Sequence, residues 1–218
     1  MTTSITPALF LNSSYQTLFM TSISFIIGSV LGMLLALILI LTRPQGLKQN
    51  IPVYMVISIV INALRSLPSL ILMIAVIPLT RWITGVSIGS TAAIVPLTLF
   101  ITPYIARLIE NSLLDINQGI IEAADAMGAS TFQIIWHFLL PEAAPSIVLS
   151  YTTSIITLLG ATAMVGTIGG GGIGNLAISY GYQRFDNVAM IITVVTLIIV
   201  VQLLQASGNA LSRFFKGN

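Results

Sequence analysis

A charge-free apolar segment, Thr17–Leu41, constrains the fold of this chain more than any other feature. It is 25 residues long, and about 20 apolar residues in a helix already span the roughly 30 Å hydrocarbon core of a bilayer. Charged residues make up only 6% of the chain, against about 25% in soluble domains. Lipid must therefore cover most of the surface, and we predict an integral membrane protein. The segment also lacks the positive flank of a cleavable signal peptide, so it is expected to remain as a helix.

Four more apolar segments complete the predicted spans. They are Ile51–Thr80, Trp82–Ala106, Ile147–Met164 and Asn187–Leu204. The intervening residues, about 107–146, contain five of the six carboxylates and the only histidine, His137. Each charge at the centre of a membrane helix costs about 2.5–3.5 kcal/mol on insertion scales. We therefore predict that this segment is a long loop outside the hydrocarbon, within a single transmembrane domain of residues 1–218.

The distribution of Lys and Arg gives the predicted orientation, because these residues accumulate in cytoplasmic loops. With five spans and an outer N-terminus, five basic residues lie inside: Arg43, Lys48, Arg107, Arg213 and Lys216. Two lie outside, Arg81 and Arg184. Dividing Ile51–Thr80 into two spans would place the basic C-terminus outside. The predicted fold is thus all-α: a polytopic membrane protein with five transmembrane helices, an outer N-terminus, a cytoplasmic C-terminus and a cytoplasmic acidic loop.

Local signals predict two short helices within this loop. The first is Ile116–Met127, and Gly128 ends it because glycine accepts the left-handed conformation at a helix C-terminus. Ser130 and Gln133 have the spacing of a capping box, which starts the second helix. That helix is expected to stop near Leu140, since the residue before a proline is pushed out of the α region. The loop is thus predicted to present a sharp helix–glycine–helix turn to the cytoplasm.

This turn belongs to a longer motif of fixed spacing. A Glu-Ala-Ala triplet begins at Glu122, Gly128 follows six residues later, and a Leu-Pro pair follows twelve residues after that glycine. The motif resembles the cytoplasmic loop of ABC-importer permease subunits. The stretches NALRSLPSLIL (62–72), PYIARLIENSLL (103–114) and GGGGIG (169–174) are similar to those of methionine-uptake permeases. The resemblance covers nearly the whole chain and implies an inner-membrane subunit for amino-acid import, most closely of methionine.

In that family the loop forms a coupling helix that docks on a separate ATPase subunit. The resemblance assigns this role to Glu122, Ala123, Ala124, Asp125, Ala126, Met127, Gly128, Ala129, Leu140 and Pro141. Small side chains permit close approach of a partner, and Glu122 and Asp125 can form charge-assisted hydrogen bonds with it. The resemblance also implies two copies of this chain, two cytoplasmic ATPases that bind ATP and Mg²⁺, and an external solute-binding protein. This chain is expected to have no catalytic residue, cofactor or metal of its own, and no basic patch indicates nucleic acid.

Arg65 is the one charge within a predicted span, and Pro68 follows it. An intramembrane charge is functional by default, which makes Arg65 a candidate for the translocation pathway. The alternative is an arginine near a helix break whose head group extends to the membrane interface. Both interpretations stay open on the sequence alone.

The remaining patterns carry weaker signals. GTIGGGGIG (166–174) lacks the Lys-Ser or Lys-Thr that ends a Walker A loop, so it is interpreted as a flexible outer loop and a candidate contact for the binding protein. Gly28 and Gly32 form a GxxxG pair, which favours close helix packing. Two rival functions lack their signals: a self-sufficient secondary transporter usually has ion-binding groups in its spans, and an intramembrane hydrolase needs a nucleophile and a base there.

Overall fold

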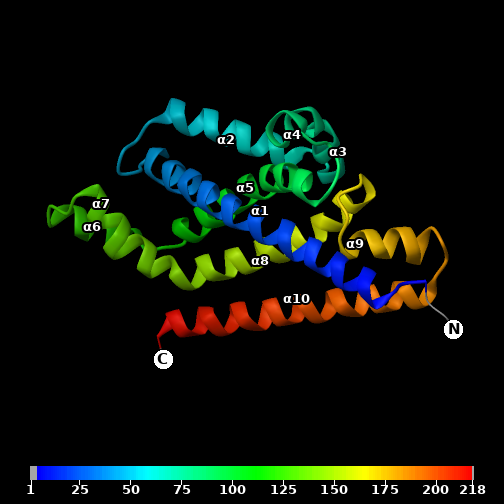
Figure 1. Ribbon diagram of the computed structural model, residues 1–218. Helices are drawn as coiled ribbons and strands as arrows, with labels where there is room; N and C mark the ends of the chain where they lie inside the picture. The colour runs from blue at the N-terminus through cyan, green and yellow to red at the C-terminus, as the bar shows by residue number, and fades with distance from the viewer. Residues whose placement is uncertain (1–3, 218) are drawn as a thin grey trace.

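Helices form the regular structure of the computed structural model, which describes residues 4–217 and has no strand among them (Figure 1). In chain order the helices are α1 Pro7–Thr42, α2 Ile51–Ser66, α3 Ser69–Ala75, α4 Ile77–Thr84, α5 Ser90–Leu114, α6 Gln118–Ala126, α7 Thr131–Gln133, the π-helical η1 Ile134–Leu139, α8 Leu140–Thr167, α9 Ile173–Leu176, the π-helical η2 Ala177–Tyr182 and α10 Asn187–Lys216. Within residues 4–217, four helices are long and apolar enough to cross a membrane: α1, α5, the continuous helix Thr131–Thr167, and α10. The bent pair α2–α3 adds a fifth if it counts as one span. The prediction of an all-helical membrane protein is confirmed.

The predicted span Ile51–Thr80 is not one helix. α2 ends at Ser66, α3 begins at Ser69, and the two helices meet at 105°. Pro68 causes the break, because Leu67 before it is extended, with φ −75° and ψ 133°. α3 and α4 then lie together at the end of α2 (Figure 1).

α5 begins and ends later than its predicted span. Trp82 lies on α4, and α5 starts only at Ser90. At the other end α5 continues past Ala106 to Leu114. Arg107 Nη1 lies 2.6 Å from Glu110 Oε2, so the two charges compensate each other within the helix. In the sequence, Arg107 and Glu110 count as two separate charges, which predicts a loop from residue 107.

The helix after the acidic loop does not stop before Pro141, as the sequence predicted. α7, η1 and α8 form one continuous helix. In η1 the Leu140 N–H donates to the Ile135 carbonyl, five residues back, and this wider turn changes the register directly before the proline. The π-helical turn directly before Pro141 accommodates the proline ring and its missing N–H, so the helix continues through it into α8. The connection between the two spans is residues 115–130, not 107–146.

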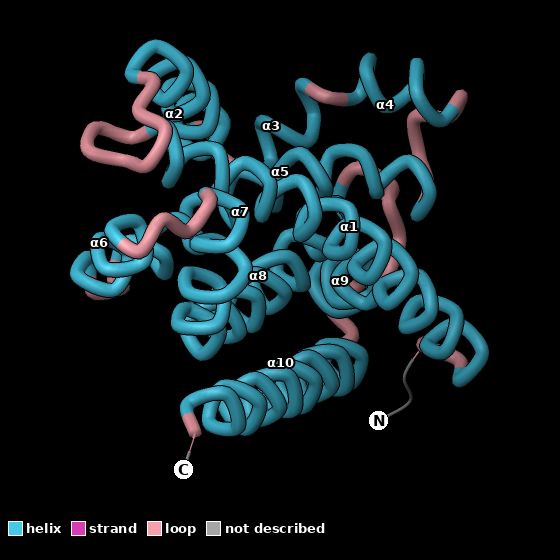
Figure 2. The backbone as a smooth tube through the Cα atoms, turned by 90° about the vertical axis from the view of Figure 1, so that its left-hand side faces the viewer, coloured by secondary structure: helices cyan, strands magenta, loops and turns pink. Residues whose placement is uncertain are grey.

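α5 is the centre of the bundle. Its residues Leu97, Ile101, Ile105, Ile109 and Leu113 recur every four positions and are at most 1% exposed. α1 packs closely against this face, because Gly28 and Gly32 leave no side chain between the two helices. The GxxxG pair therefore serves packing within the chain. α8 lies between α5 and α10 (Figure 1 and Figure 2).

The two termini lie at opposite ends of the bundle. The C-terminus lies at the same end as α6 and α7, and the N-terminus lies near the turn into α10 (Figure 1). The glycine-rich stretch near the N-terminal end is a packed turn, not the loose loop predicted from its composition. Gly172 N–H donates to Gln16 Oε1 at 3.0 Å, and Ile173 N–H donates to Thr17 Oγ1 at 2.8 Å. Glycine is needed there because α1 passes directly against the turn.

Candidate functional site

Eight of the ten predicted coupling residues, Glu122 to Ala129, lie in one exposed corner of the molecule, formed by α6, the turn after it and α7 (residues 118–133, called the α6–α7 corner). α6 ends in a Schellman motif: Gly128 N–H donates to the Asp125 carbonyl at 2.9 Å, and Ala129 N–H donates to the Ala124 carbonyl at 3.1 Å. Gly128 has φ 80°, so the predicted left-handed turn is confirmed. A Cβ built on Gly128 meets nothing within 4 Å, so the outside of the turn is open.

The start of α7 is fixed by the predicted capping box. Ser130 Oγ accepts from the Gln133 N–H at 3.4 Å, and Gln133 Oε1 accepts from the Ser130 N–H at 2.8 Å. The backbone on both sides of the turn is therefore held by its own hydrogen bonds. The corner can therefore move as one rigid unit and displace η1 and α8 with it.

The predicted coupling residues divide into an exposed and a structural group. Those exposed are Glu122, Ala123, Asp125, Ala126, Met127, Gly128 and Pro141. Ala124 is completely buried, and Leu140 is half-buried against the core, so neither offers a surface to a partner. Ala129 is half-buried in the turn. The motif thus encodes both the outward surface and the packing that holds it.

Glu122 and Asp125 line a cleft of about 300 Å³ whose opposite wall is the loop between α1 and α2. Arg43, Gln45 and Gly46 of that loop face the two carboxylates across it. The Arg43 Nε is buried and has no hydrogen-bond partner in the described chain. This cleft could not be predicted from local patterns, because its walls are about 80 positions apart in the chain.

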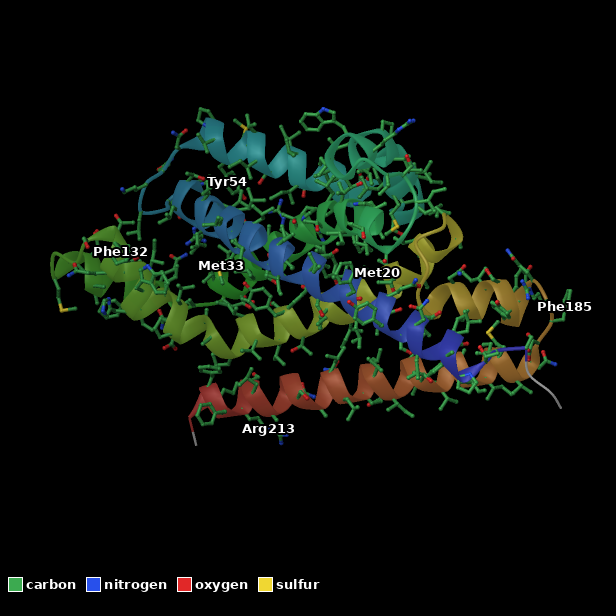
Figure 3. The ribbon with its side chains drawn as sticks, viewed as in Figure 1. Met20, Met33, Tyr54, Phe132, Phe185 and Arg213 are labelled. Atoms are coloured by element: carbon green, nitrogen blue, oxygen red, sulfur yellow. The ribbon has the colours of Figure 1, made fainter. Side chains whose placement is uncertain are left out.

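Large apolar side chains are exposed on this corner and on η1 directly after it. Met127, Phe132 and Trp136 are 74%, 67% and 56% exposed, and the rings of Phe132 and Trp136 are 5.9 Å apart. Figure 3 shows Phe132 at the end of the molecule where Arg213 lies, opposite Phe185. A cluster of large exposed apolar side chains marks a contact surface for a protein or membrane. Sequence reasoning missed Phe132 and Trp136, although their i, i+4 spacing behind the capping box was visible.

Arg65 lies away from this corner, in the last turn of α2 beside the break. It is exposed, its guanidinium carbon lies 5.9 Å from the centroid of the Tyr104 ring, and no described carboxylate pairs with it. His137 is exposed near the corner, with Nδ1 3.3 Å from the Gln133 carbonyl oxygen. Among residues 4–217 no group of three His, Cys, Asp or Glu side chains could hold a metal ion.

Several apolar spans and an exposed corner held by its own hydrogen bonds define a multi-pass membrane protein. The chain belongs to the family described as "binding-protein-dependent transport system inner membrane component", which matches residues 28–213. It is 48% identical over 205 residues to the probable D-methionine transport system permease protein MetI of Vibrio cholerae, covering 94% of this chain and 91% of that one. It is 47% identical over 152 residues to the D-methionine transport system permease protein MetI of Escherichia coli K12, covering 70% of each chain.

Solved structures give the same result. An inward-facing conformation of the MetNI methionine ABC transporter superposes with a TM-score of 0.94 at 41% identity, covering 97% of this chain and 99% of that one. An amino acid ABC transporter matches with a TM-score of 0.76 at 22% identity, which shows the fold alone.

Proposed function

We propose that this chain is the permease subunit of an ATP-driven ABC importer for amino acids, with methionine as its substrate. The observation that carries the proposal is the similarity to methionine permeases along 94% of the chain. The alternatives are a permease for another amino acid or small solute, and a self-sufficient secondary transporter. The second alternative is disfavoured because the one carboxylate buried in a spanning helix, Glu110, is already paired with Arg107 in the described chain.

Two copies of the chain form the pathway, two cytoplasmic ATPases bind ATP and Mg²⁺, and an external binding protein delivers the solute. The N-terminus lies outside and the C-terminus in the cytoplasm, with α2–α3 as the second of five spans. This chain itself has no catalytic role. The two-fold assembly is supported by the small number of spans, too few to enclose a pathway alone.

The α6–α7 corner docks on the ATPase. Its exposed apolar side chains supply contact area, and Glu122 and Asp125 supply charge-assisted hydrogen bonds. ATP binding closes the two ATPases and draws the two corners together. The motion passes into α8, because α7, η1 and α8 are one continuous helix. Arg65, exposed at the break of the second span, lines the pathway that this motion opens and closes.

The test is purification of the tagged chain from native membranes, identification of its companions and transport by the purified complex. Liposomes with ATP inside and the binding protein outside are expected to accumulate labelled methionine. Liposomes without ATP serve as the control. Methionine accumulation by this chain alone would support a secondary transporter, and stronger competition by another amino acid would reassign the substrate.

A further inference from the structure

The exposed face of α8 carries small and polar side chains beside two larger apolar ones, where a lipid-facing helix would be apolar throughout. Residues Ser146, Leu149, Thr153, Thr157, Gly160 and Met164 recur at spacings of three and four, and all are exposed except the half-buried Thr157. We call this the polar face of α8. The other faces of α8 pack against α1, α5 and α10. Apart from Thr157, which contacts Tyr104, and Met164, which contacts Ser69, the residues of the polar face are exposed in the described chain.

α10, which runs beside α8, shows what a lipid-facing surface of this protein looks like. Its exposed residues Val194, Val195, Ile198, Ile199 and Leu203 are all large and apolar, and Gln202 is the one exposed polar residue among them. A Cβ built on Gly160 of α8 meets nothing within 4 Å, so packing inside the chain does not require a glycine there. Polar surfaces in a membrane usually face a protein interior or a water-filled cavity.

Arg65 is linked to this polar face through Tyr104 of α5. Its guanidinium lies over the Tyr104 ring, and Tyr104 Oη is 3.5 Å from Thr157 Oγ1. On the other side of the α2–α3 break, Ser69 Oγ is 2.8 Å from Met164 Sδ. The break thus places Arg65, the one cation of the second span, near the middle of α8, with Tyr104 between them.

The charge of Arg65 has no counterpart in the described chain. The other arginine near the middle of the bundle, Arg107, pairs with Glu110. A guanidinium presents a planar fork of N–H donors that matches a carboxylate. An amino acid that crosses the membrane as a zwitterion brings such a carboxylate.

We infer that the polar face of α8 forms this chain's wall of the translocation pathway, and that Arg65 binds the carboxylate of an amino acid within it. The inference rests on the proposed function and adds the place and chemistry of solute contact. Its occupant is a zwitterionic amino acid in water. A dry contact between two copies of the chain is the competing outcome.

The first experiment compares thiols at matched depth on α8 and α10. Two contacts show which residues of α8 and α10 lie at the same depth: Ser212 Oγ donates to the Pro145 carbonyl, and Gly208 packs on Thr152. Gly160 is therefore level with Ile199, and Thr157 is level with Leu203. The chain has no cysteine of its own. In the permease–ATPase complex in nanodiscs, Gly160→Cys and Thr157→Cys are expected to react with an anionic methanethiosulfonate at least about tenfold faster than Ile199→Cys and Leu203→Cys, because the thiolate forms in water. The modified permease is identified by its mass.

Equal, slow reaction at all four sites would overturn the inference. Disulfide formation between two Gly160→Cys copies without reagent modification would also overturn it and assign this face to a dry dimer contact.

The second experiment tests Arg65. Millimolar methionine is expected to slow modification of Gly160→Cys severalfold, and methioninol, which lacks the carboxylate, is not. Adding Arg65→Gln should abolish protection by methionine, whereas Arg65→Lys should keep part of it. Equal protection by methionine and methioninol, or full protection in the Arg65→Gln complex, would contradict the assignment.

ATP-driven methionine uptake by the parent complex is measured in parallel. Absence of uptake would count against the proposed function, whereas normal uptake with the wrong reaction pattern would overturn this inference alone.

Discussion

Gly128 and Gly85 both end helices in the left-handed conformation, with φ 80° and 76°, and a Cβ on either would meet nothing within 4 Å. A β-branched side chain in this conformation costs about 1–2 kcal/mol at either position. Gly128 lies in the α6–α7 corner and Gly85 follows α4, away from it. We predict that Gly128→Val abolishes ATPase co-purification and reduces methionine uptake to near zero, at normal abundance in the membrane. Gly85→Val, the matched control, should keep more than about half of the uptake.

Equal loss of uptake in both variants would show that strain alone is responsible. Normal uptake with Gly128→Val would show that the corner is not the coupling element.

The buried ion pair of α5 gives a second prediction at this scale. Glu110 is 2% exposed, and Arg107 also donates to Asn62 Oδ1 at 2.9 Å, which ties α5 to α2. Removing one partner leaves a poorly solvated charge, at a cost of about 3 kcal/mol, whereas removing both does not. Glu110→Gln should lower the apparent melting temperature of the purified complex, and Arg107→Met with Glu110→Met should recover most of the loss. A single variant as stable as the parent would contradict this account.

Among elements, the contact between α1 and α5 depends most directly on side-chain size. A Cβ at position 32 would lie 2.6 Å from Ile105 Cγ2 and 3.1 Å from the Thr102 carbonyl oxygen, and the backbone cannot retreat. Gly32→Leu is therefore expected to force the helices apart and reduce folded protein in the membrane several-fold. Val30 of α1 is 57% exposed, so Val30→Leu adds bulk without a clash and should not change the amount of folded protein. Fluorescence-detected size exclusion of tagged protein measures both, and normal yield of Gly32→Leu would refute the packing argument.

The sequence predicted the elements whose signals are local. The Gly128 turn and the Ser130 capping box depend on a few neighbouring residues, and both are present. The predicted helix bounds were wrong where one feature compensates for another. Arg107 and Glu110 were counted as separate charges, and Pro141 was treated as a helix end because the preceding π-helical turn has no sequence signal of its own.

The candidate site was likewise predictable only in part. Its exposed residues followed from the spaced motif, whereas the cleft opposite Arg43 and the contact of Arg65 with Tyr104 join distant segments.

For the whole molecule, the prediction concerns orientation. The end with α6, α7 and the C-terminus should face the cytoplasm, because the Lys and Arg residues gather there. In intact cells an impermeant thiol reagent should label Gln183→Cys, which is exposed at the other end, and leave Gln49→Cys and Lys216→Cys unlabelled. After permeabilisation all three should react. Labelling of Gln49→Cys in intact cells would reverse the topology.

The central claim is that the α6–α7 corner couples the ATPase to a pathway along α8. The most direct test measures how fast Gly160→Cys reacts with the anionic methanethiosulfonate added from the cytoplasmic side of the complex. The rate is compared with and without nucleotide trapped by vanadate. Trapping should lower the reaction rate at least about tenfold in the complex with native Gly128, and should leave it unchanged for the Gly128→Val permease mixed with the same amount of ATPase. The same rate with and without trapped nucleotide in the complex with native Gly128 would contradict the account.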